Sequence, residues 1–431
     1  MKASEELSRP TVGRVQLLKP RIHFHTDCPF FAGCENMLAV LFTHSEFREM
    51  FDVTFSYGYS ARYEKGFRSR VRADFPIHPL RTSLGLGRYA PESSRWPRAA
   101  LVKLDGYLSF PFSVGAIYRL LRRVRPDILH INNGGYPGAY SCSAAVFAAR
   151  LAGIRRIVYV VNNVAVPRRS FHRRMDFWMD GFVSRKVNTF VTASAYAGQR
   201  LREVLGLREE RALTLPNTIL SRFPDESPSE TRARLHIGAD EVVIGCVAVQ
   251  EERKGQRFLI EAFDALRKEL QGRVPLRLVL EGTGSMRSHL ERLVRDRGLV
   301  NEVIFCEERN VYNLYQCLDL LVLPSIGFED FPNVILEVMS LGKPVIGTRV
   351  AGIPEQIRDG YNGYVVEPKD TDGLCRAMRA LVTDPNLRET MGRRSRELFE
   401  ANFQPNVIVG RYIELYRSLM EGGKEIIHAH A

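Results

Sequence analysis

Short apolar runs alternate with longer segments of helical periodicity along most of this chain. The runs predict β-strands at residues 21–27, 128–131, 157–161, 189–192, 242–249, 276–280, 303–305 and 319–324. Helical spacing predicts helices at residues 35–45, 256–270 and about 286–297. Such alternation favours parallel, doubly wound sheets. Its repetition on both sides of a Pro-, Ser- and Asp-rich segment at residues 216–228 predicts two Rossmann-like domains in one α/β protein.

The segment after the 319–324 strand carries the most specific chemistry. Pro332 suits the first turn of a helix, and Gly342 suits the residue just past its end. Glu329 then lies in the loop, and Glu337 lies about five residues into the helix, roughly 7 Å further along its axis. A carboxylate can hold a ribose diol, and a helix N-terminus can hold an anion. The alternative to such a ligand site is that Glu329 caps the helix and that Glu337 is an ordinary surface residue.

The spacing of the two glutamates, with Phe331, Asn333 and Val334 between them, resembles the donor-site signature of the retaining glycosyltransferases of family 4. The resemblance implies a GT-B fold, in which two Rossmann-like domains face each other across a cleft. It implies that Glu329 contacts the transferred sugar and that Glu337 holds the ribose. The backbone amides of Phe331, Asn333 and Val334 would meet the distal phosphate and the sugar.

Two further segments match the same family. Residues 31–35 resemble its Gly-Gly-x-Glu loop, and Gly33 is the retained glycine that would approach the donor diphosphate. Lys254 stands in the place of the diphosphate-binding lysine, but Val249 occupies the position of the usual arginine. We therefore expect Arg253, or a basic residue of the first domain, to complete the cationic clamp.

Five other positions take their roles from the resemblance. Gly282 and Gly284 follow a strand and would line the nucleotide pocket, and Asn310 and Val311 would border the base. Asn162 stands where many relatives place a histidine that faces the donor sugar, and it can hydrogen-bond but cannot titrate. We predict Glu329, Lys254 and Asn162 as the catalytic set, with metal-free chemistry and no cofactor besides the sugar nucleotide.

Length and composition agree with two domains, because 431 residues are many for a single core. We expect a polar leader at residues 1–20, an acceptor domain at 21–220 and a donor domain at 221–403. We expect residues 404–431 to form a helix that returns to the first domain. No stretch approaches ~18 uninterrupted apolar residues, so no transmembrane helix is expected. We therefore expect a cytoplasmic protein, with peripheral contact at the cytoplasmic face of the membrane.

Positive charge is concentrated in the first half. Residues 1–215 hold 33 Lys and Arg against 17 Asp and Glu, a net charge of +16, and the remainder holds 28 against 32, a net of −4, which together give +12. This asymmetry favours an anionic partner such as a lipid-linked acceptor or an anionic membrane. No nucleic-acid motif accompanies it, so nucleic acid is not expected.

The densest basic cluster contains Arg168, Arg169, Arg173 and Arg174. A stripe of Phe171, Met175, Trp178 and Phe182 follows at helical spacing, as in an interfacial amphipathic helix. The alternative is a domain helix that packs this stripe on its own sheet. In both readings the arginines could face the bilayer or the acceptor.

Seven cysteines are scattered without a Cys-x-x-Cys pair, and several lie in apolar runs. This pattern is typical of free, buried thiols in a reducing compartment and gives no sign of a metal site. His23 and His25 alternate along the first strand, where packing and hydrogen bonding are expected rather than metal ligation.

The sequence therefore predicts a retaining hexosyltransferase that uses a UDP- or GDP-sugar, in cell-surface polysaccharide or glycolipid assembly. A catalytically impaired sugar-nucleotide binding protein remains an alternative because of Val249 and Asn162. A nucleotide-sugar epimerase of similar architecture is a second alternative. An NAD-dependent dehydrogenase would depend on Gly282 and Gly284, but Arg287 replaces the third glycine of that fingerprint.

Overall fold

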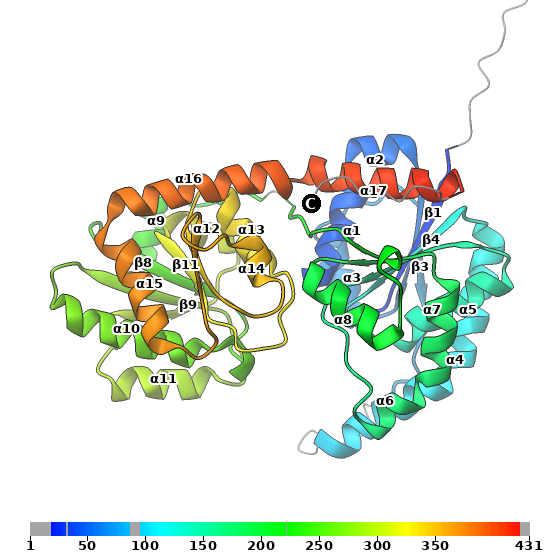
Figure 1. Ribbon diagram of the computed structural model, residues 1–431, viewed down its shortest axis with the longest axis horizontal. Coiled ribbons are helices and arrows are strands. Elements are labelled where there is room, and N and C mark those ends of the chain that lie inside the picture. The colour runs from blue at the N-terminus through cyan, green and yellow to red at the C-terminus, as the bar shows by residue number, and fades with distance from the viewer. Residues whose placement is uncertain (1–18, 32, 87–94, 221, 423–431) are drawn as a thin grey trace, which may run out of the picture.

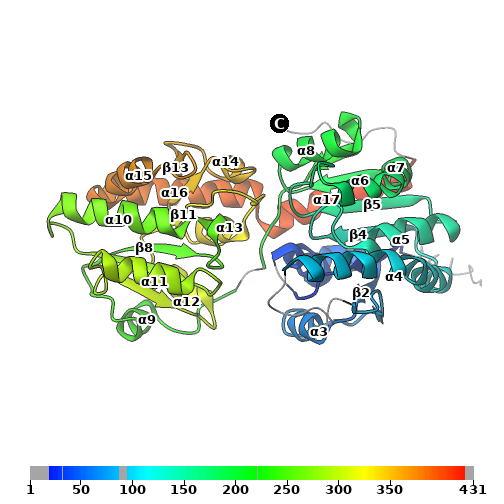
Figure 2. The same cartoon turned by 90° about the horizontal axis from the view of Figure 1, so that it is seen from below.

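The computed structural model describes residues 19–31, 33–86, 95–220 and 222–422. These residues form two lobes that lie side by side, each built around one β-sheet with helices on both faces (Figures 1 and 2). Every strand pairing in both sheets is parallel. The predicted fold class, two doubly wound α/β domains of GT-B type, is confirmed.

The first sheet has seven strands in the order β3-β2-β1-β4-β5-β6-β7. Its strands are β1 (Arg21–Thr26), β2 (Asp52–Gly58), β3 (Ile77–Leu80), β4 (Ile128–Asn133), β5 (Arg156–Val161), β6 (Thr189–Thr192) and β7 (Ala212–Thr214). The second sheet has six strands in the order β10-β9-β8-β11-β12-β13. Its strands are β8 (Val242–Val247), β9 (Leu276–Glu281), β10 (Val303–Cys306), β11 (Leu320–Leu323), β12 (Val345–Thr348) and β13 (Gly363–Val366).

Helices connect the strands in both lobes. Those of the first lobe are α1 (Asn36–Thr43), α2 (Ser45–Met50), α3 (Ala61–Arg68), α4 (Arg95–Val124), α5 (Tyr140–Leu151), α6 (Phe171–Met175), α7 (Phe177–Lys186) and α8 (Ala195–Leu205). Those that follow are α9 (Pro228–Arg234), α10 (Gln256–Leu270), α11 (Arg287–Asp296), α12 (Val311–Cys317), α13 (Asn333–Ser340), α14 (Ile353–Gln356), α15 (Thr371–Thr383), α16 (Pro385–Asn402) and α17 (Pro405–Met420). None of the helices in these described ranges is long and apolar enough to cross a membrane.

Strand β2 was not predicted, and its contacts explain why. Polar residues interrupt its apolar pattern, yet Thr54 and Ser56 are buried and pair with the histidines of β1. His23 contacts both hydroxyls at 2.8 Å, and His25 contacts Ser56 at 2.9 Å. The two histidines therefore serve packing and hydrogen bonding, as expected, and burial lowers the pKa of His25 to about 4.

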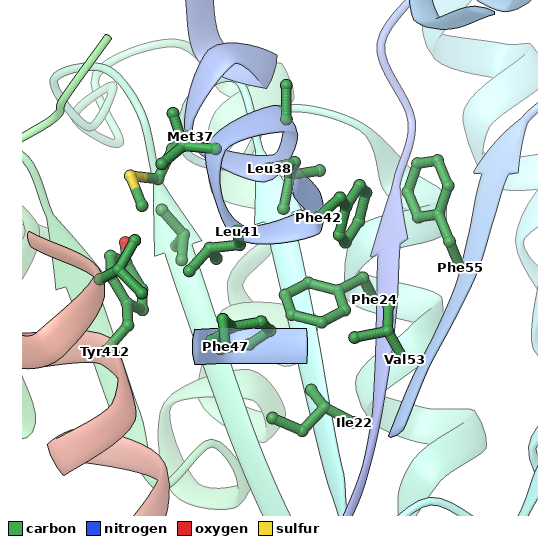
Figure 3. Close-up of a cluster of buried hydrophobic side chains, with 14 of the residues drawn as sticks. Ile22, Phe24, Met37, Leu38, Leu41, Phe42, Phe47, Val53, Phe55 and Tyr412 are labelled. Atoms are coloured by element: carbon green, nitrogen blue, oxygen red, sulfur yellow. The ribbon is translucent and has the colours of Figure 1, made fainter. Parts of the chain in front are cut away.

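The core of the first lobe includes the end of the chain. Tyr412 of α17 packs with side chains from β1, α1 and α2, among them Phe24 and Phe47 (Figure 3). Tyr416 adds a hydrogen bond to His130 of β4, with 2.7 Å between its hydroxyl and Nδ1. Helix α16 lies on the second lobe and α17 on the first, so the two consecutive helices run along both lobes (Figure 1).

Candidate active site

The order of strands places the predicted site residues at two reversal points. In the second sheet the chain runs from β8 outward through β9 to β10 and then returns to the other side of β8 with β11. The first sheet reverses in the same way between β1 and β4. Ligands of open α/β sheets bind beyond the carboxyl ends of the strands at such points. Lys254 and Glu329 follow β8 and β11, and Gly33 follows β1.

Lys254 and Glu329 are in direct contact. Lys254 is buried, and its ammonium donates to Oε2 of Glu329. Ser325 donates to the same oxygen at 3.2 Å, and a guanidinium nitrogen of Arg253 lies 3.7 Å from it. Two cations of one loop therefore converge on one carboxylate, a contact that the sequence analysis did not predict, since it assigned Lys254 and Arg253 to the diphosphate and Glu329 to the sugar.

A glycine makes this contact between the two loops possible. Gly255 has a φ of +68°, and a Cβ there would lie 2.1 Å from the carbonyl oxygen of Pro324. The adjacent amide of Ile326 donates to the carbonyl of Arg253 at 2.8 Å. Only a residue without a side chain lets the β8 loop approach the β11 loop so closely.

Helix α13 begins one residue later than predicted, because Pro332 is its N-cap and lies outside the first turn. The first amides of any α-helix lack intrahelical partners, so those of Asn333 and Val334 are available to a ligand. The side chain of Asn333 donates to the carbonyl oxygen of Gly33 at 3.1 Å. This contact brings the predicted Gly33 loop of the first lobe beside the N-terminus of α13.

Phe331 is buried and has a packing role. Its ring lies 5.7 Å from that of Phe403, and its carbonyl oxygen accepts a hydrogen bond from Asn217 at 3.4 Å. The side chain of Phe331 therefore anchors the loop before α13, while its backbone stays at the site.

Glu337 occupies a partly buried, polar position on α13. The Tyr315 hydroxyl donates to its Oε2 at 2.6 Å. Burial raises the pKa of Glu337, although the hydrogen bond from Tyr315 and the charge of Arg222 oppose the shift. Burial likewise raises the pKa of Glu281, at the end of β9, to about 7. Sequence reasoning missed Glu281 and Tyr315, because neither belongs to the spaced glutamate pattern.

Gly282 and Gly284 have a structural reason to be glycines. A Cβ on Gly282 would lie 2.5 Å from the carbonyl oxygen of Ala248, and one on Gly284 would lie 2.3 Å from that of Gln250. Backbone hydrogen bonds join the two segments, including Gln250 N to Thr283 O at 2.8 Å. The glycine loop is thus packed on the segment that leads to Lys254.

Asn310 caps α12, which begins at Val311. Its side-chain amide donates to Phe223 at 2.9 Å and to Asp225 at 3.0 Å, and its Oδ1 accepts from the amide of Tyr312 at 3.3 Å. Phe223 and Asp225 belong to the segment that connects the two lobes. The Asn310 side chain therefore fixes this segment to the start of α12.

Asn162 lies at the end of β5, away from the Lys254 contacts. Its amide donates to Asn132 Oδ1 at 2.9 Å and to the carbonyl of Asn133 at 3.0 Å. Both partners belong to β4 of the same lobe, so the structure does not bring Asn162 into contact with Glu329 or Lys254.

Additional contacts between the lobes surround the site. Ser194, the N-cap of α8, donates to Asp330, the neighbour of Glu329. Glu355 of α14 accepts from the first two amides of α8, at 2.8 Å from Ala195 and 3.0 Å from Tyr196. Burial raises the pKa of Asp330 to about 6. A serine before a helix is a recognisable N-cap signal in the sequence, so the capping role of Ser194 could be predicted. Its contact with Asp330 of the other lobe could not.

A pocket of about 370 Å³ lies beyond the carboxyl end of β1 in the first lobe. Three carboxylates line it, those of Asp27, Asp105 and Asp176, together with Tyr140 and Lys103. Ser141 donates to Asp27, and burial raises the pKa of that carboxyl. Carboxylates and a tyrosine hydroxyl are suited to recognise hydroxyl groups.

Two of the four predicted surface arginines are committed to internal ion pairs. Arg173 is buried, with a guanidinium nitrogen 2.8 Å from Asp180 and 3.5 Å from Asp176. Arg168 also binds Asp180 at 2.8 Å. The prediction that Arg173 faces a bilayer or acceptor is wrong, because it neutralises buried carboxylates.

Arg169 and Arg174 are exposed, and within the described residues neither forms an ion pair. The predicted apolar stripe is divided between two helices, α6 and α7. Trp178 is half exposed but touches Phe110 of α4, with 5.7 Å between ring centroids.

Exposed apolar side chains gather on the two neighbouring elements, α4 and the α6–α7 pair. They are Val102, Leu104, Leu108 and Phe112 of α4, with Met175, Phe177 and Trp178 of α6–α7. We call this set the apolar rim, and Val102 is its member that also lines the pocket.

Two family models match the chain. One, described as glycosyl transferases group 1, covers residues 228–398, and the other, described as a glycosyl transferase 4-like domain, covers residues 48–218. The GDP-mannose-dependent alpha-(1-6)-phosphatidylinositol monomannoside mannosyltransferase of Mycolicibacterium smegmatis is 30% identical over 284 residues, 62% of this chain and 71% of the relative. The alpha-D-kanosaminyltransferase of Streptomyces kanamyceticus is 27% identical over 341 residues, 73% of this chain and 86% of the relative.

Solved structures show the same architecture. The structure of Anabaena HepE in complex with UDP matches with a TM-score of 0.73 at 18% identity. The match covers 92% of this chain and 100% of the HepE chain. A glycosyltransferase from Rickettsia africae matches with a TM-score of 0.74 at 14% identity, covering 94% of this chain and 99% of its own. At these identities the likeness establishes the fold.

Proposed function

This chain belongs to the group 1 glycosyltransferases of family 4, and we propose that it moves a hexose from a nucleoside diphosphate sugar to an acceptor hydroxyl with retention of configuration. The observation that carries the proposal is the convergence of Lys254 and Arg253 on Glu329 at the reversal point of the second sheet. The M. smegmatis relative is GDP-mannose-dependent by name, and HepE was solved with UDP, which supports a UDP- or GDP-sugar donor here.

In the proposed donor complex the diphosphate replaces Glu329 as the partner of the two cations. Lys254 and Arg253 then stabilise the charge that develops on the leaving group, together with the free amides of α13. Glu329 is released from Lys254 and turns to the sugar. Glu337, held in place by Tyr315, accepts the ribose hydroxyls.

We propose that the leaving diphosphate itself takes the acceptor proton during attack on the same face of the sugar. Charge stabilisation by Lys254, Arg253 and the α13 amides requires no metal ion or other cofactor. Glu329 and Glu337 act in binding and positioning. Asn162 remains a candidate for a sugar contact only after its hydrogen bonds to β4 are exchanged.

For the acceptor we propose a hydroxyl-rich headgroup carried on a lipid. The pocket beside Asp27, Asp105 and Asp176 suits hydroxyl groups better than the anionic group suggested by net charge. The apolar rim, of which Val102 lines this pocket, suits a hydrocarbon chain or a bilayer surface. We therefore place the reaction at the cytoplasmic membrane face, in polysaccharide or glycolipid assembly.

The test is product formation with a panel of UDP- and GDP-sugars and a lipid extract, analysed by mass spectrometry. One donor should label a lipid-linked product, and NMR of that product should show the anomeric configuration of the donor. Glu329→Gln should reduce transfer strongly while nucleotide binding persists. Binding of a sugar nucleotide without turnover of any donor would favour the impaired binding protein, and release of an epimerised sugar without acceptor would favour the epimerase.

A further inference from the structure

The turn between β1 and α1 brings together two thiols and a carboxylate. The Sγ atoms of Cys28 and Cys34 lie 3.7 Å apart, and Cys34 Sγ lies 3.9 Å from Oε1 of Glu35. One ligand atom from each of the three residues lies within 4.8 Å of the others. Cys28 and Glu35 are buried, and Cys34 is partly exposed.

We propose that Cys28, Cys34 and Glu35 form a binding site for a thiophilic divalent cation of the zinc type. Two sulfurs bound to one tetrahedral ion at about 2.3 Å lie ~3.8 Å apart, which matches the separation of the thiols here. A carboxylate oxygen at about 2.0 Å completes a set of three protein ligands. The partly exposed side of Cys34 leaves the fourth position to water.

The surroundings of Glu35 favour its role as a ligand. Thr26 donates to its Oε1 at 2.9 Å, Asn132 to the same oxygen at 3.2 Å, and Tyr63 to Oε2 at 2.8 Å. Outer hydrogen bonds of this kind orient metal-binding carboxylates. No ion pair within the described residues reaches Glu35, so a cation would supply the positive charge that this buried group lacks.

A disulfide is the competing product of the same two thiols. Its sulfur atoms would have to approach to about 2.05 Å, and the carboxylate would have no part in it. The observed separation and the third ligand favour the cation. Sequence reasoning missed the cluster because the two cysteines are six residues apart, outside the Cys-x-x-Cys spacing, and the turn alone brings them together.

The site has a defined place relative to the donor loop. Gly33 lies between the cysteines in sequence, and its carbonyl accepts the hydrogen bond from Asn333 of α13. A cation held by Cys28 and Cys34 would link the two ends of this turn across Gly33. The metal site does not depend on the proposed donor or acceptor.

The experiment uses the purified full-length chain, kept reduced with a phosphine and freed of metal by a chelator. Cd²⁺ is added, and the ultraviolet charge-transfer band of cadmium thiolate is followed. One equivalent of Cd²⁺ should produce the band in the wild type, and Zn²⁺ should displace it. Zn²⁺ should also raise the melting temperature of the wild type, because it binds the folded state.

Cys28→Ser with Cys34→Ser should abolish the band and the Zn²⁺-dependent rise. Cys306→Ser with Cys375→Ser, which removes two cysteines that are partly exposed like Cys34, should retain both. Glu35→Gln should weaken Cd²⁺ binding at least tenfold, and circular dichroism should verify that each variant is folded. An equal band in the wild type and the Cys28/Cys34 variant would overturn the site. So would a reduced wild-type protein that takes up no Cd²⁺.

Discussion

Lys254 and Glu329 neutralise each other while the donor is absent. Both side chains are about nine-tenths buried, at 11% and 12% exposure, so each would be costly to leave without a partner. A diphosphate offers Lys254 a replacement anion, and the sugar hydroxyls offer Glu329 new donors. The ion pair thus stabilises the site before the donor binds, and both side chains can exchange this contact for contacts with the donor.

Lys254→Ala should therefore weaken binding of UDP or GDP. Loss of one hydrogen bond to a charged group costs about 1.5–3 kcal/mol, which corresponds to roughly a tenfold to hundredfold rise in Kd. Calorimetric titration measures this rise directly. Lys268→Ala, which removes an exposed lysine paired with Asp264, serves as the matched control and should leave the Kd unchanged.

Unchanged nucleotide affinity in the Lys254 variant would remove the phosphate role from this residue. A drop in melting temperature with full nucleotide affinity would mean that Lys254 serves only to balance Glu329.

At the level of elements, the loops around the site were predictable where one segment carried the whole signal. The strand, loop and helix from 319 to 342 could be read because Pro332, Gly342 and the two glutamates mark it locally. The contacts of Asp330 with Ser194, and of Glu355 with the start of α8, join residues more than 130 positions apart. No local pattern encodes such pairs, since they depend on how the two lobes meet.

The exposure of the arginine cluster was unpredictable for a similar reason. Arg173 looked like a surface residue because its neighbours are basic, but Asp176 and Asp180 one and two helical turns later bind it. The net charge of a segment does not reveal which of its charged side chains form ion pairs within the fold.

Asp330 connects the β11–α13 loop to α8, and its ionisation should make this contact pH-dependent. The folded state raises its pKa from 3.8 to about 6 through burial. A raised carboxyl pKa favours the folded state at low pH, and this advantage is lost as the pH rises through about 6. The full difference corresponds to ~3 kcal/mol.

Asp330→Asn keeps an oxygen that can accept from Ser194 but carries no charge. Its melting temperature relative to the wild type should therefore increase between pH 5 and pH 7.5, as scanning calorimetry can measure. Asp240→Asn, which removes an exposed carboxylate, is the control. A constant difference between the Asp330 variant and the wild type across this pH range would show that Asp330 is not a charged, buried group at neutral pH.

At the level of the whole molecule, the two lobes differ in surface character. The first carries a net charge of +16 over residues 1–215 and the apolar rim, and the rest carries −4. In addition, α17 belongs to the core of the first lobe, so that lobe is built from both ends of the described chain (Figure 3). A membrane-facing first lobe and a donor-binding second lobe would let the acceptor stay in the bilayer while the sugar nucleotide enters from water.

Liposome flotation tests this arrangement with two kinds of substitution. Leu108→Gln with Phe112→Gln removes exposed apolar side chains, of which Phe112 is 69% exposed, and should reduce binding to neutral and anionic vesicles alike. Arg169→Gln with Arg174→Gln should reduce only the preference for anionic lipid. Each cation near such a surface contributes ~1 kcal/mol, so the pair should change partitioning by roughly thirtyfold.

The arginine effect should disappear at high salt, because the Debye length falls from about 10 Å at 0.1 M to 3 Å at 1 M, whereas the apolar effect should persist. Arg393→Gln with Arg396→Gln removes two exposed arginines of α16 on the second lobe and should leave flotation unchanged. If this control reduced binding as much as the Arg169/Arg174 variant, total charge and not the first lobe would govern the contact. If no variant differed from the wild type, or if the wild type did not float, the apolar rim would have no membrane role and a water-soluble acceptor would replace the lipid-linked one.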